Sequence, residues 1–376
     1  MISVVLKIGG SLLRDGRSYI NAAEKIKELF IEQGLGTVIV VSAMKGVTDS
    51  LIRAYNGSIN DLYAVMERYI NAASYVGGQS LVRRVREELD RLEIVFKSNL
   101  SRDNATRDLM LSFGERLSRI IMTEALSLVG VKAVGVDARD IIKTNSIHGN
   151  AVINYDETRK RLVGINALLK DGIACVIEGF IGSDNYGATT TLGRGGSDYT
   201  ATTIAALLGL REVYLVTDVP GIMTCDPKYV SSPRIVRVLS YSEAIEASFY
   251  GGKRLHPRTF HPLINIHGSV VHIGCWDRWG TTIVKNYAEG SLRGPKLIAF
   301  RKKNRGSPVA LVGEGVSTPT IMRDIIDYIS SHDLFFEGLY MIKGRPSIVL
   351  LFEDKMLGKA LHVLHNLVLE WGSYEV

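Results

Sequence analysis

The hydrophobic pattern of the first 220 residues alternates between short buried strands and longer amphipathic helices. Runs of β-branched and apolar residues predict strands, and apolar residues three or four positions apart predict helices. The strands expected here are Ile2 to Ile8, Gly36 to Val41, Val131 to Val136, Ile173 to Ile177 and Glu212 to Val216. Helices are expected over residues 19–33, over most of 51–126 and from Ala201 to Leu208. This order predicts an α/β fold with a mainly parallel central sheet between helices.

The remainder of the chain is richer in predicted strands. A helix from Tyr241 to Phe249 and strands at Ile264 to Ile273 and Thr281 to Val284 are expected to complete the first domain, residues 1–290. Composition changes near Ser291 to Pro295, which predicts a linker. The elements expected beyond it are strands at Lys296 to Phe300, Val309 to Val312, Phe336 to Ile342 and Ser347 to Phe352, with helices Ile321 to Ser330 and Leu357 to Leu369. Residues 295–376 therefore read as a small α+β domain.

Composition narrows the functional classes. The 376 residues are 46% hydrophobic, and the formal net charge of +6 is scattered apart from one run, Arg301 to Lys303 with Arg305. That run lacks aromatic or glycine interleaving, so we expect no nucleic-acid partner. Three widely spaced cysteines suggest neither a zinc site nor a disulfide framework, and a reducing cytoplasm is expected. No apolar stretch is long enough to predict a membrane span.

A glycine-rich turn carries two charged side chains between a predicted strand and a predicted helix. Thr190 to Ala201 reads Thr-Thr-Leu-Gly-Arg-Gly-Gly-Ser-Asp-Tyr-Thr-Ala, which contains Arg194 and Asp198. Glycines let backbone N–H groups approach an anion, and the positive end of the following helix would face the same ligand. A plain surface turn is the alternative. An arginine and a carboxylate so close together favour a site for an anionic reactant and a metal-bound phosphate.

A lysine stands near the end of the first predicted strand. Lys7 precedes Gly9 and Gly10 in an otherwise apolar run. A lysine in such a strand is costly unless it meets an anion, and the glycines would let backbone N–H groups join in holding phosphate oxygens. The alternative is a lysine that extends its ammonium group into water.

Other polar residues stand at the ends of predicted elements. Thr48 or Asp49 follows the second strand, and either one is also a good helix N-cap. Glu115 follows a glycine at what reads as the head of an apolar helix, where the helix dipole alone would explain an acidic residue. Thr217 and Asp218 leave the C-terminus of a strand, where α/β enzymes bind nucleotides.

Three of these segments resemble the aspartokinase branch of the amino acid kinase family. They are Gly193-Arg-Gly-Gly-Ser-Asp198, Gly114-Glu-Arg-Leu-Ser118 and the stretch from Thr217 to Lys228, and the resemblance covers most of residues 1–290. The last domain resembles an ACT domain, a module that binds amino acids and pairs with its own copy. Family members usually carry two such modules, whereas residues 295–376 have room for one and an extra strand. A homodimer through this domain is the expectation.

The resemblance also implies roles for individual residues. The implied catalytic residues are Lys7, Gly9, Gly10 and Asp198, and the implied substrate-binding residues are Ser11, Thr48, Glu115, Arg194 and Ser197. The implied ATP-binding residues are Lys7, Thr217, Asp218, Met223, Lys228, Lys253 and Arg254. No protein side chain is predicted as a dedicated metal ligand. Four positions depart from the usual family pattern, namely Ile8, Leu12, Met223 and Lys228.

The reaction implied by the resemblance is transfer of a phosphoryl group from ATP, with Mg²⁺, to the side-chain carboxylate of L-aspartate. The product, 4-phospho-L-aspartate, would begin the routes to lysine, threonine and methionine. Lys7 would neutralise the transferring group, Asp198 would orient Lys7 or help to hold the metal, and Glu115 and Arg194 would bind the substrate's ammonium and carboxylate. A carboxylate is already ionised near neutral pH, so this reaction needs no general base.

Two other functions stay open at this point. Another amino acid kinase acting on a different acid or phosphate is the first, which Ile8 and Leu12 favour. A non-catalytic amino-acid sensor is the second, with the ACT-like end as its active part.

Overall fold

The computed structural model describes residues 2–98, 102–252, 256–285, 293–303 and 306–372. The chain divides into two compact units, Met1–Asp218 and Val219–Val376. The domain boundary predicted near residue 290 falls among residues 286–292, which lie outside the described residues, and it stays a prediction.

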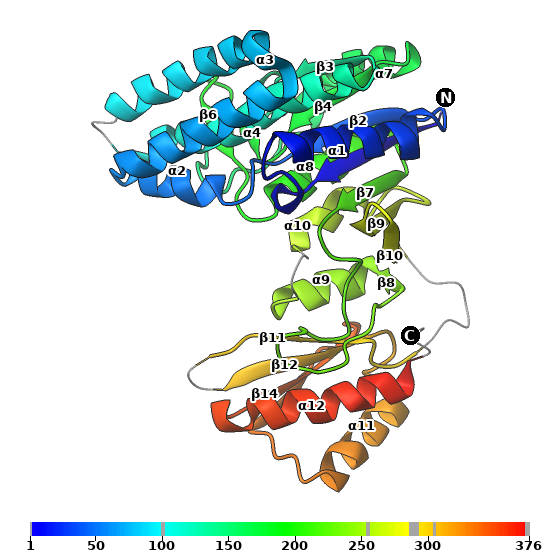
Figure 1. Cartoon of the computed structure of the whole chain (residues 1–376). Helices are drawn as coiled ribbons and strands as arrows, with labels where there is room; N and C mark the ends of the chain where they lie inside the picture. Colours follow the sequence, from blue (N-terminus) through cyan, green and yellow to red (C-terminus); the bar gives the residue numbers. More distant parts are fainter. Residues whose placement is uncertain (1, 99–101, 253–255, 286–292, 304–305, 373–376) are drawn as a thin grey trace. The chain divides into compact units, whose positions relative to one another are not determined.

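The first unit is built on a parallel sheet. Its strands are β1 (Ser3–Ile8), β2 (Gly36–Val41), β3 (Ala133–Val136), β4 (Ala174–Glu178) and β7 (Glu212–Val216), in the spatial order β3-β4-β2-β1-β7 (Figure 1). Each neighbouring pair is parallel. β1, β2 and β4 consist largely of fully buried Val, Ile and Leu, as expected for strands covered on both faces. The predicted parallel α/β sheet is confirmed.

Helices and one hairpin surround this sheet. The helices are α1 (Gly16–Ile26), α2 (Val47–Tyr55), α3 (Ile59–Lys97), α4 (Asn104–Leu128), α5 (Ala138–Ile141), α6 (Tyr155–Arg161), α7 (Val163–Lys170) and α8 (Gly196–Leu208). A 3₁₀ turn (Gly10–Leu12) follows β1, and a π-helical turn (Lys27–Ile31) follows α1. α3 and α4 pack along each other, and α4 also packs on β2, β3 and β4 (Figure 1). Strands β5 (Ile181–Ser183) and β6 (Thr189–Thr191) form an antiparallel hairpin.

The strand register aligns the C-terminal ends of neighbouring strands at one edge of the sheet. Ile8 is level with Val41 on one side and with Val216 on the other, and Val41 is level with Glu178. The residues that follow these strands therefore emerge at the same carboxyl edge, where open α/β sheets bind ligands.

The second unit contains two groups of strands. β9 (Val270–Cys275) pairs antiparallel with β10 (Arg278–Val284), which pairs parallel with β8 (Val238–Ser240). β11 (Leu297–Phe300), β12 (Ser307–Val312), β14 (Ser347–Phe352) and β13 (Gly338–Met341) form an antiparallel sheet in that order. The helices are α9 (Tyr241–Phe249), α10 (Pro257–Phe260), α11 (Pro319–Ser331) and α12 (Asp354–Trp371), with a 3₁₀ turn at His261–Leu263. Residues from this sheet and from α11 and α12 share one apolar core.

One predicted strand is wrong over half of its length. Residues Ile264 to Ser269 form turns, and β9 begins only at Val270. Ile266 N donates to Leu263 O and Ser269 N to Ile266 O, while the Ser269 hydroxyl donates to Leu263 O. These local bonds occupy donors that a strand would offer to its neighbour.

Candidate functional site

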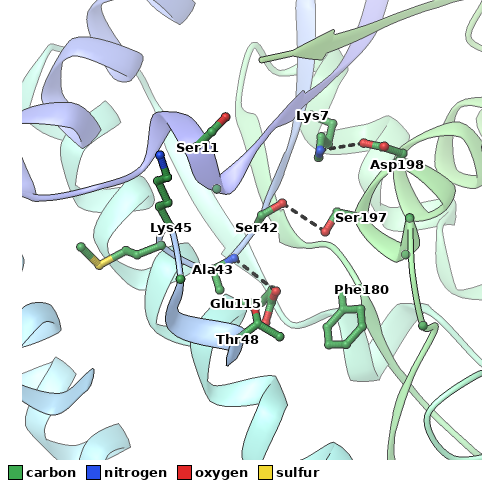
Figure 2. A pocket seen from close by; sticks show the side chains of 16 residues that line it. Lys7, Ser11, Ser42, Ala43, Lys45, Thr48, Glu115, Phe180, Ser197 and Asp198 are labelled. Atoms are coloured by element: carbon green, nitrogen blue, oxygen red, sulfur yellow. Dashed lines mark hydrogen bonds and ion pairs between the residues drawn. The ribbon is translucent and has the colours of Figure 1, made fainter. Parts of the chain in front are cut away.

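Lys7 contacts the segment that follows the glycine turn, at the carboxyl edge of the sheet in the first unit. Its Nζ lies 2.7 Å from Oδ1 of Asp198, and the two side chains are 16% and 18% exposed. Asp198 lies in the first turn of α8, so a strand residue and a helix residue far apart in sequence form one ion pair (Figure 2). The alternative in which Lys7 extends into water is wrong.

The glycines that follow Lys7 let neighbouring groups approach the backbone closely. A Cβ on Gly10 would stand 2.5 Å from the carbonyl oxygen of Ala43, so only glycine fits there. Gly9 N donates to Val216 O at 3.1 Å. The Gly9 amide is therefore not free to bind phosphate, and that sequence-based expectation is corrected. Glycine at position 9 still keeps a side chain away from Lys7, because its Cβ would lie 3.7 Å from the lysine Nζ.

The glycine turn adopts backbone conformations that suit glycine. Gly193 and Gly195 have φ angles of 75° and 72°, in the left-handed region. Gly195 is the N-cap of α8, so Ser197 and Asp198 fall in the first turn of that helix. The Ser197 hydroxyl lies 3.1 Å from that of Ser42, which follows β2 (Figure 2). The turn and the strand ends thus form one surface.

These elements enclose a pocket of about 430 Å³ in the first unit. The residues that line it are Lys7, Gly10, Ser11, Ser42, Ala43, Met44, Lys45, Gly46, Thr48, Glu115, Phe180, Gly193, Gly195, Gly196, Ser197 and Asp198. The predicted site residues among them come from β1, α2, α4 and α8 and from the turns between, as Figure 2 shows.

Glu115 is the buried acid of this pocket. It lies in the middle of α4, whose N-cap is Asp103, so the interpretation as a first-turn acid stabilised by the helix dipole is wrong. Its Oε1 accepts a hydrogen bond from Ala43 N at 3.2 Å, whereas its buried Oε2 has no hydrogen-bond partner. Burial raises the pKa of Glu115 to about 8. A cationic ligand group would satisfy Oε2.

Two residues with hydroxyl groups, Thr48 and Ser11, also line the pocket. Thr48 lies inside the first turn of α2, whose N-cap is Gly46 with φ 80°, so neither Thr48 nor Asp49 is the cap. The N-cap alternative is therefore wrong, and Thr48 lines the pocket beside Glu115 (Figure 2). The Ser11 hydroxyl is buried in the pocket without a hydrogen-bond partner. Buried polar groups of this kind normally mark a missing ligand or water.

Arg194 differs from the other predicted substrate residues. It is exposed and does not line the pocket, although Gly193 and Gly195 on either side of it do. The turn therefore holds the guanidinium group outside the pocket wall in this conformation.

The predicted nucleotide residues fall in different places. Thr217 and Asp218 follow β7, next to the end of β1, and the Thr217 hydroxyl donates to Asp218 Oδ1 at 3.3 Å. Met223 and Lys228 belong to the second unit, where both line a pocket of about 510 Å³. Apolar residues of β11, Leu297 to Phe300, form another part of that wall. Lys253 and Arg254 lie outside the described residues.

The pocket residues that sequence reasoning missed include Ser42, Lys45 and Phe180. Ser42 and Lys45 come from the turn after β2, and Phe180 has a left-handed φ of 71°. A Cβ on Gly196 would stand 2.9 Å from the Phe180 ring. The position of Ser42 directly after a buried strand was the available signal. The orientation of Phe180 depends on a contact that no local pattern reveals.

Neither a preformed metal cluster nor a membrane helix occurs in the part of the chain that the structure describes. No group of three or more His, Cys, Asp or Glu side chains in that part has the arrangement of a metal site. No helix there is long and apolar enough to span a membrane.

Comparisons with known proteins identify the family. Residues 3–274 match the amino acid kinase family. The chain is 32% identical over 308 residues to the lysine-sensitive aspartokinase 3 of Escherichia coli, covering 76% of this chain and 65% of that protein. It is 31% identical over 337 residues to an aspartokinase of Pseudomonas aeruginosa, covering 88% of this chain and 70% of that protein.

A solved structure gives the same result. The crystal structure of E. coli aspartokinase III with aspartate and ADP matches with a TM-score of 0.73 and 25% identity, covering 94% of this chain and 79% of that one. The chain spans about half to two thirds of the length of several curated aspartokinases that it matches. With its parallel sheet, its Lys7–Asp198 pair and its glycine turn, the chain belongs to the amino acid kinase family, among the aspartokinases.

Proposed function

We propose that this protein transfers the γ-phosphoryl group of ATP to the side-chain carboxylate of L-aspartate, giving 4-phospho-L-aspartate and ADP. The observation that carries the proposal is that one pocket contains both a basic side chain, Lys7, and a buried acidic side chain, Glu115. Lys7 stands at the carboxyl edge of the sheet, and Glu115 presents a buried oxygen without a partner. A zwitterionic acid has the complementary charges. The E. coli enzyme that matches this fold binds aspartate and ADP.

Glu115 would bind the α-ammonium group of the substrate. The buried Oε2 needs a donor, and an ammonium group supplies both the hydrogen bond and the compensating charge. Thr48 lies beside Glu115, and the hydroxyl groups of Ser11 and Ser197 would orient the rest of the substrate. Arg194 would bind the α-carboxylate once the glycine turn brings it over the pocket. The two charges together discriminate an amino acid from a simple acid.

Lys7 would stabilise the phosphoryl group during transfer. Phosphoryl transfer needs mainly alignment of two anions and neutralisation of their repulsion, and an ammonium group held by Asp198 is preorganised for that task. Gly10 would keep the turn after β1 close to the Ala43 backbone, because a Cβ there would meet the Ala43 carbonyl oxygen. The acceptor carboxylate is ionised, so no proton is removed.

Mg²⁺ would be held mainly by the nucleotide. In kinases this ion commonly takes one or two carboxylates and completes its shell with phosphate oxygens and water, so the carboxylate of Asp198 in the pocket is compatible with it. The ion would supply neutralisation of phosphate charge. For ATP we propose Thr217, Asp218, Met223 and Lys228 as contacts, together with Lys253 and Arg254.

The C-terminal region would act as an ACT-like regulatory module. We propose residues 295–376 as this domain, with a homodimer formed through it and an amino acid as effector. Support comes from the antiparallel sheet with α11 and α12 and from the E. coli relative, which has been solved with lysine and aspartate. We also propose action in the cytoplasm, at the start of the synthesis of lysine, threonine and methionine. The free state of Cys175, Cys225 and Cys275 fits a reducing compartment.

The test is an ADP-release assay over aspartate, glutamate, carbamate and nucleoside monophosphates, with and without lysine and threonine. Turnover with aspartate alone is the expected result. Preference for another acceptor would assign a different amino acid kinase reaction. Amino-acid binding by calorimetry without any ATP turnover would assign a sensor instead, and either result would overturn the proposal.

A further inference from the structure

A second carboxylate on α4 is buried and has no part in the chemistry proposed above. Asp108 precedes Glu115 by two helical turns, and its side chain is fully buried. Residues seven apart lie on nearly the same face of a helix. A buried ionised carboxylate is costly unless several donors surround it. What surrounds Asp108 therefore indicates its purpose.

The groups around Asp108 come from two segments that are distant in sequence. Thr191 N donates to Oδ2 at 2.8 Å and the Thr191 hydroxyl to Oδ1 at 2.7 Å. Gly149 N donates to Oδ2 at 2.9 Å, and Nδ1 of His148 lies 3.1 Å from the same oxygen. Three donors and an imidazole nitrogen occupy one carboxylate, so both segments must be in place for Asp108 to be satisfied.

Both segments form the base of the glycine turn. Thr191 is the last residue of β6, two positions before Gly193. Ala151 N donates to Thr191 O at 2.9 Å, which joins the two segments directly. A Cβ on Gly193 would lie 3.0 Å from Gly149 O and from Asn150 Oδ1, so the turn rests on the 149–150 loop. Asp108 is the common anchor of the turn and of the loop beneath it.

We propose that Asp108 is a positioning residue, which fixes the base of the glycine turn through Thr191 and Gly149, so that Arg194 at the tip of the turn reaches the substrate carboxylate from a fixed support. The expected effect on catalysis rests on the proposed function. The fixing of the turn by Asp108 does not depend on it. Asp108 itself does not line the pocket, so it acts only through the backbone that it holds.

The chain offers a matched control in Asp184. This residue is also buried, at 4% exposure, and its carboxylate also holds a turn. Its Oδ1 accepts from Tyr186 N at 3.0 Å and Ala188 N at 2.9 Å, and its Oδ2 accepts from the Ser146 hydroxyl at 2.8 Å. The turn that it holds, between β5 and β6, contributes no residue to the pocket. A general loss of packing would affect both variants alike.

The experiment compares Asp108→Ala with Asp184→Ala in the full chain. Hydrogen exchange by mass spectrometry is followed in overlapping peptides, and KM is measured for aspartate and for ATP. Asp108→Ala removes the acceptor for both segments at once. We expect exchange over residues 191–198 to rise at least tenfold and KM for aspartate to rise at least tenfold, with KM for ATP within twofold. Asp184→Ala should speed exchange over residues 184–188 and near Ser146 but not over residues 191–198, and it should leave KM for aspartate within twofold.

A milder pair of variants covers the case in which Asp108→Ala does not fold. Thr191→Val removes one donor and keeps the shape, whereas Thr191→Ser keeps the hydroxyl. We expect several-fold faster exchange over residues 191–198 and a several-fold higher KM for aspartate only in the valine variant. Unchanged exchange over 191–198 in both Asp108→Ala and Thr191→Val would overturn the proposal. If the wild-type protein does not turn over aspartate, the proposed function fails, and the exchange comparison still decides whether Asp108 fixes the turn.

Discussion

The ammonium nitrogen of Lys7 lies 2.7 Å from the Oδ1 of Asp198, which joins the end of β1 to the first turn of α8. An ammonium group this poorly exposed is costly without an anion nearby. Asp198 supplies that anion and also points the lysine toward the pocket, where the phosphoryl group would provide a second one.

Removing Lys7 should abolish most turnover without unfolding the protein. Loss of one preorganised electrostatic contact in an active site typically lowers kcat by about 10²–10³-fold, so we expect Lys7→Ala to fall in that range. An ADP-release assay gives kcat, and circular dichroism reports the fold. Lys25→Ala is the matched control, because Lys25 forms a surface ion pair with Glu28 and does not line the pocket. Turnover within fivefold of the wild type in Lys7→Ala would remove this lysine from the mechanism.

Aspartate binding should strengthen as pH rises toward 8. Burial raises the pKa of Glu115 to about 8, so in the empty pocket the side chain is largely protonated below that pH. The substrate ammonium needs the ionised form, and binding therefore releases a proton. Affinity should fall roughly tenfold for each pH unit below about 8. Calorimetry in buffers of different ionisation enthalpy measures both the affinity and the released proton.

The same group makes the empty protein less stable at high pH. The pKa of Glu115 is raised in the folded state, so its contribution to stability is full below the unfolded value, near 4.5, and is lost as pH rises through about 8. Glu115→Gln does not titrate. Its free energy of unfolding, measured in urea at pH 5 and pH 8, should drop less over this interval than that of the wild type. An equal drop in both proteins would show that Glu115 does not titrate differently on folding.

Two glycine substitutions test how tightly the pocket is built. A Cβ on Gly10 would meet the Ala43 carbonyl oxygen at 2.5 Å, and backbone on both sides would have to move. We expect Gly10→Ala to lower the free energy of unfolding by about 1–3 kcal/mol and to reduce turnover strongly. Gly164 lies in α7 with nothing within 4 Å of its would-be Cβ, so Gly164→Ala should instead stabilise by about 0.5–1 kcal/mol. Urea unfolding of both variants checks the signs, and equal effects would contradict the close approach.

Local patterns in the sequence revealed the parallel sheet, Lys7 and the glycine turn, because each is written in consecutive residues. The sequence pattern puts Glu115 at the head of a helix, whereas α4 already begins at Asn104. The N-cap of α4 is Asp103, whose side chain accepts a hydrogen bond from Thr106 N. Asp108 gave no signal at all. Its partners, Thr191 and Gly149, become its neighbours only through the fold. The exposed position of Arg194 likewise depends on the turn's conformation and not on residue type.

A hydrogen bond between Thr224 and His365 should make the second unit sensitive to acid. Nε2 of His365 lies 2.9 Å from the Thr224 hydroxyl, next to the predicted nucleotide contact Met223. Burial, together with His362 and Arg234, lowers the pKa of His365 below 6.5. The neutral ring can accept the Thr224 proton, whereas a protonated ring cannot. The stability contributed by His365 is therefore present above pH 6.5 and is lost as pH falls below it.

His365→Gln keeps a polar group near Thr224 but does not titrate. The melting temperature of the wild type should fall more between pH 7.5 and pH 5.5 than that of His365→Gln, by several degrees. His267→Gln, at an exposed position before β9, should keep the wild-type difference. Thr224→Val removes the bond itself, and we expect it to cost about 1 kcal/mol at pH 7.5. Parallel pH dependence in the wild type and His365→Gln would show that this histidine does not sense pH, because the other titrating groups are common to both proteins.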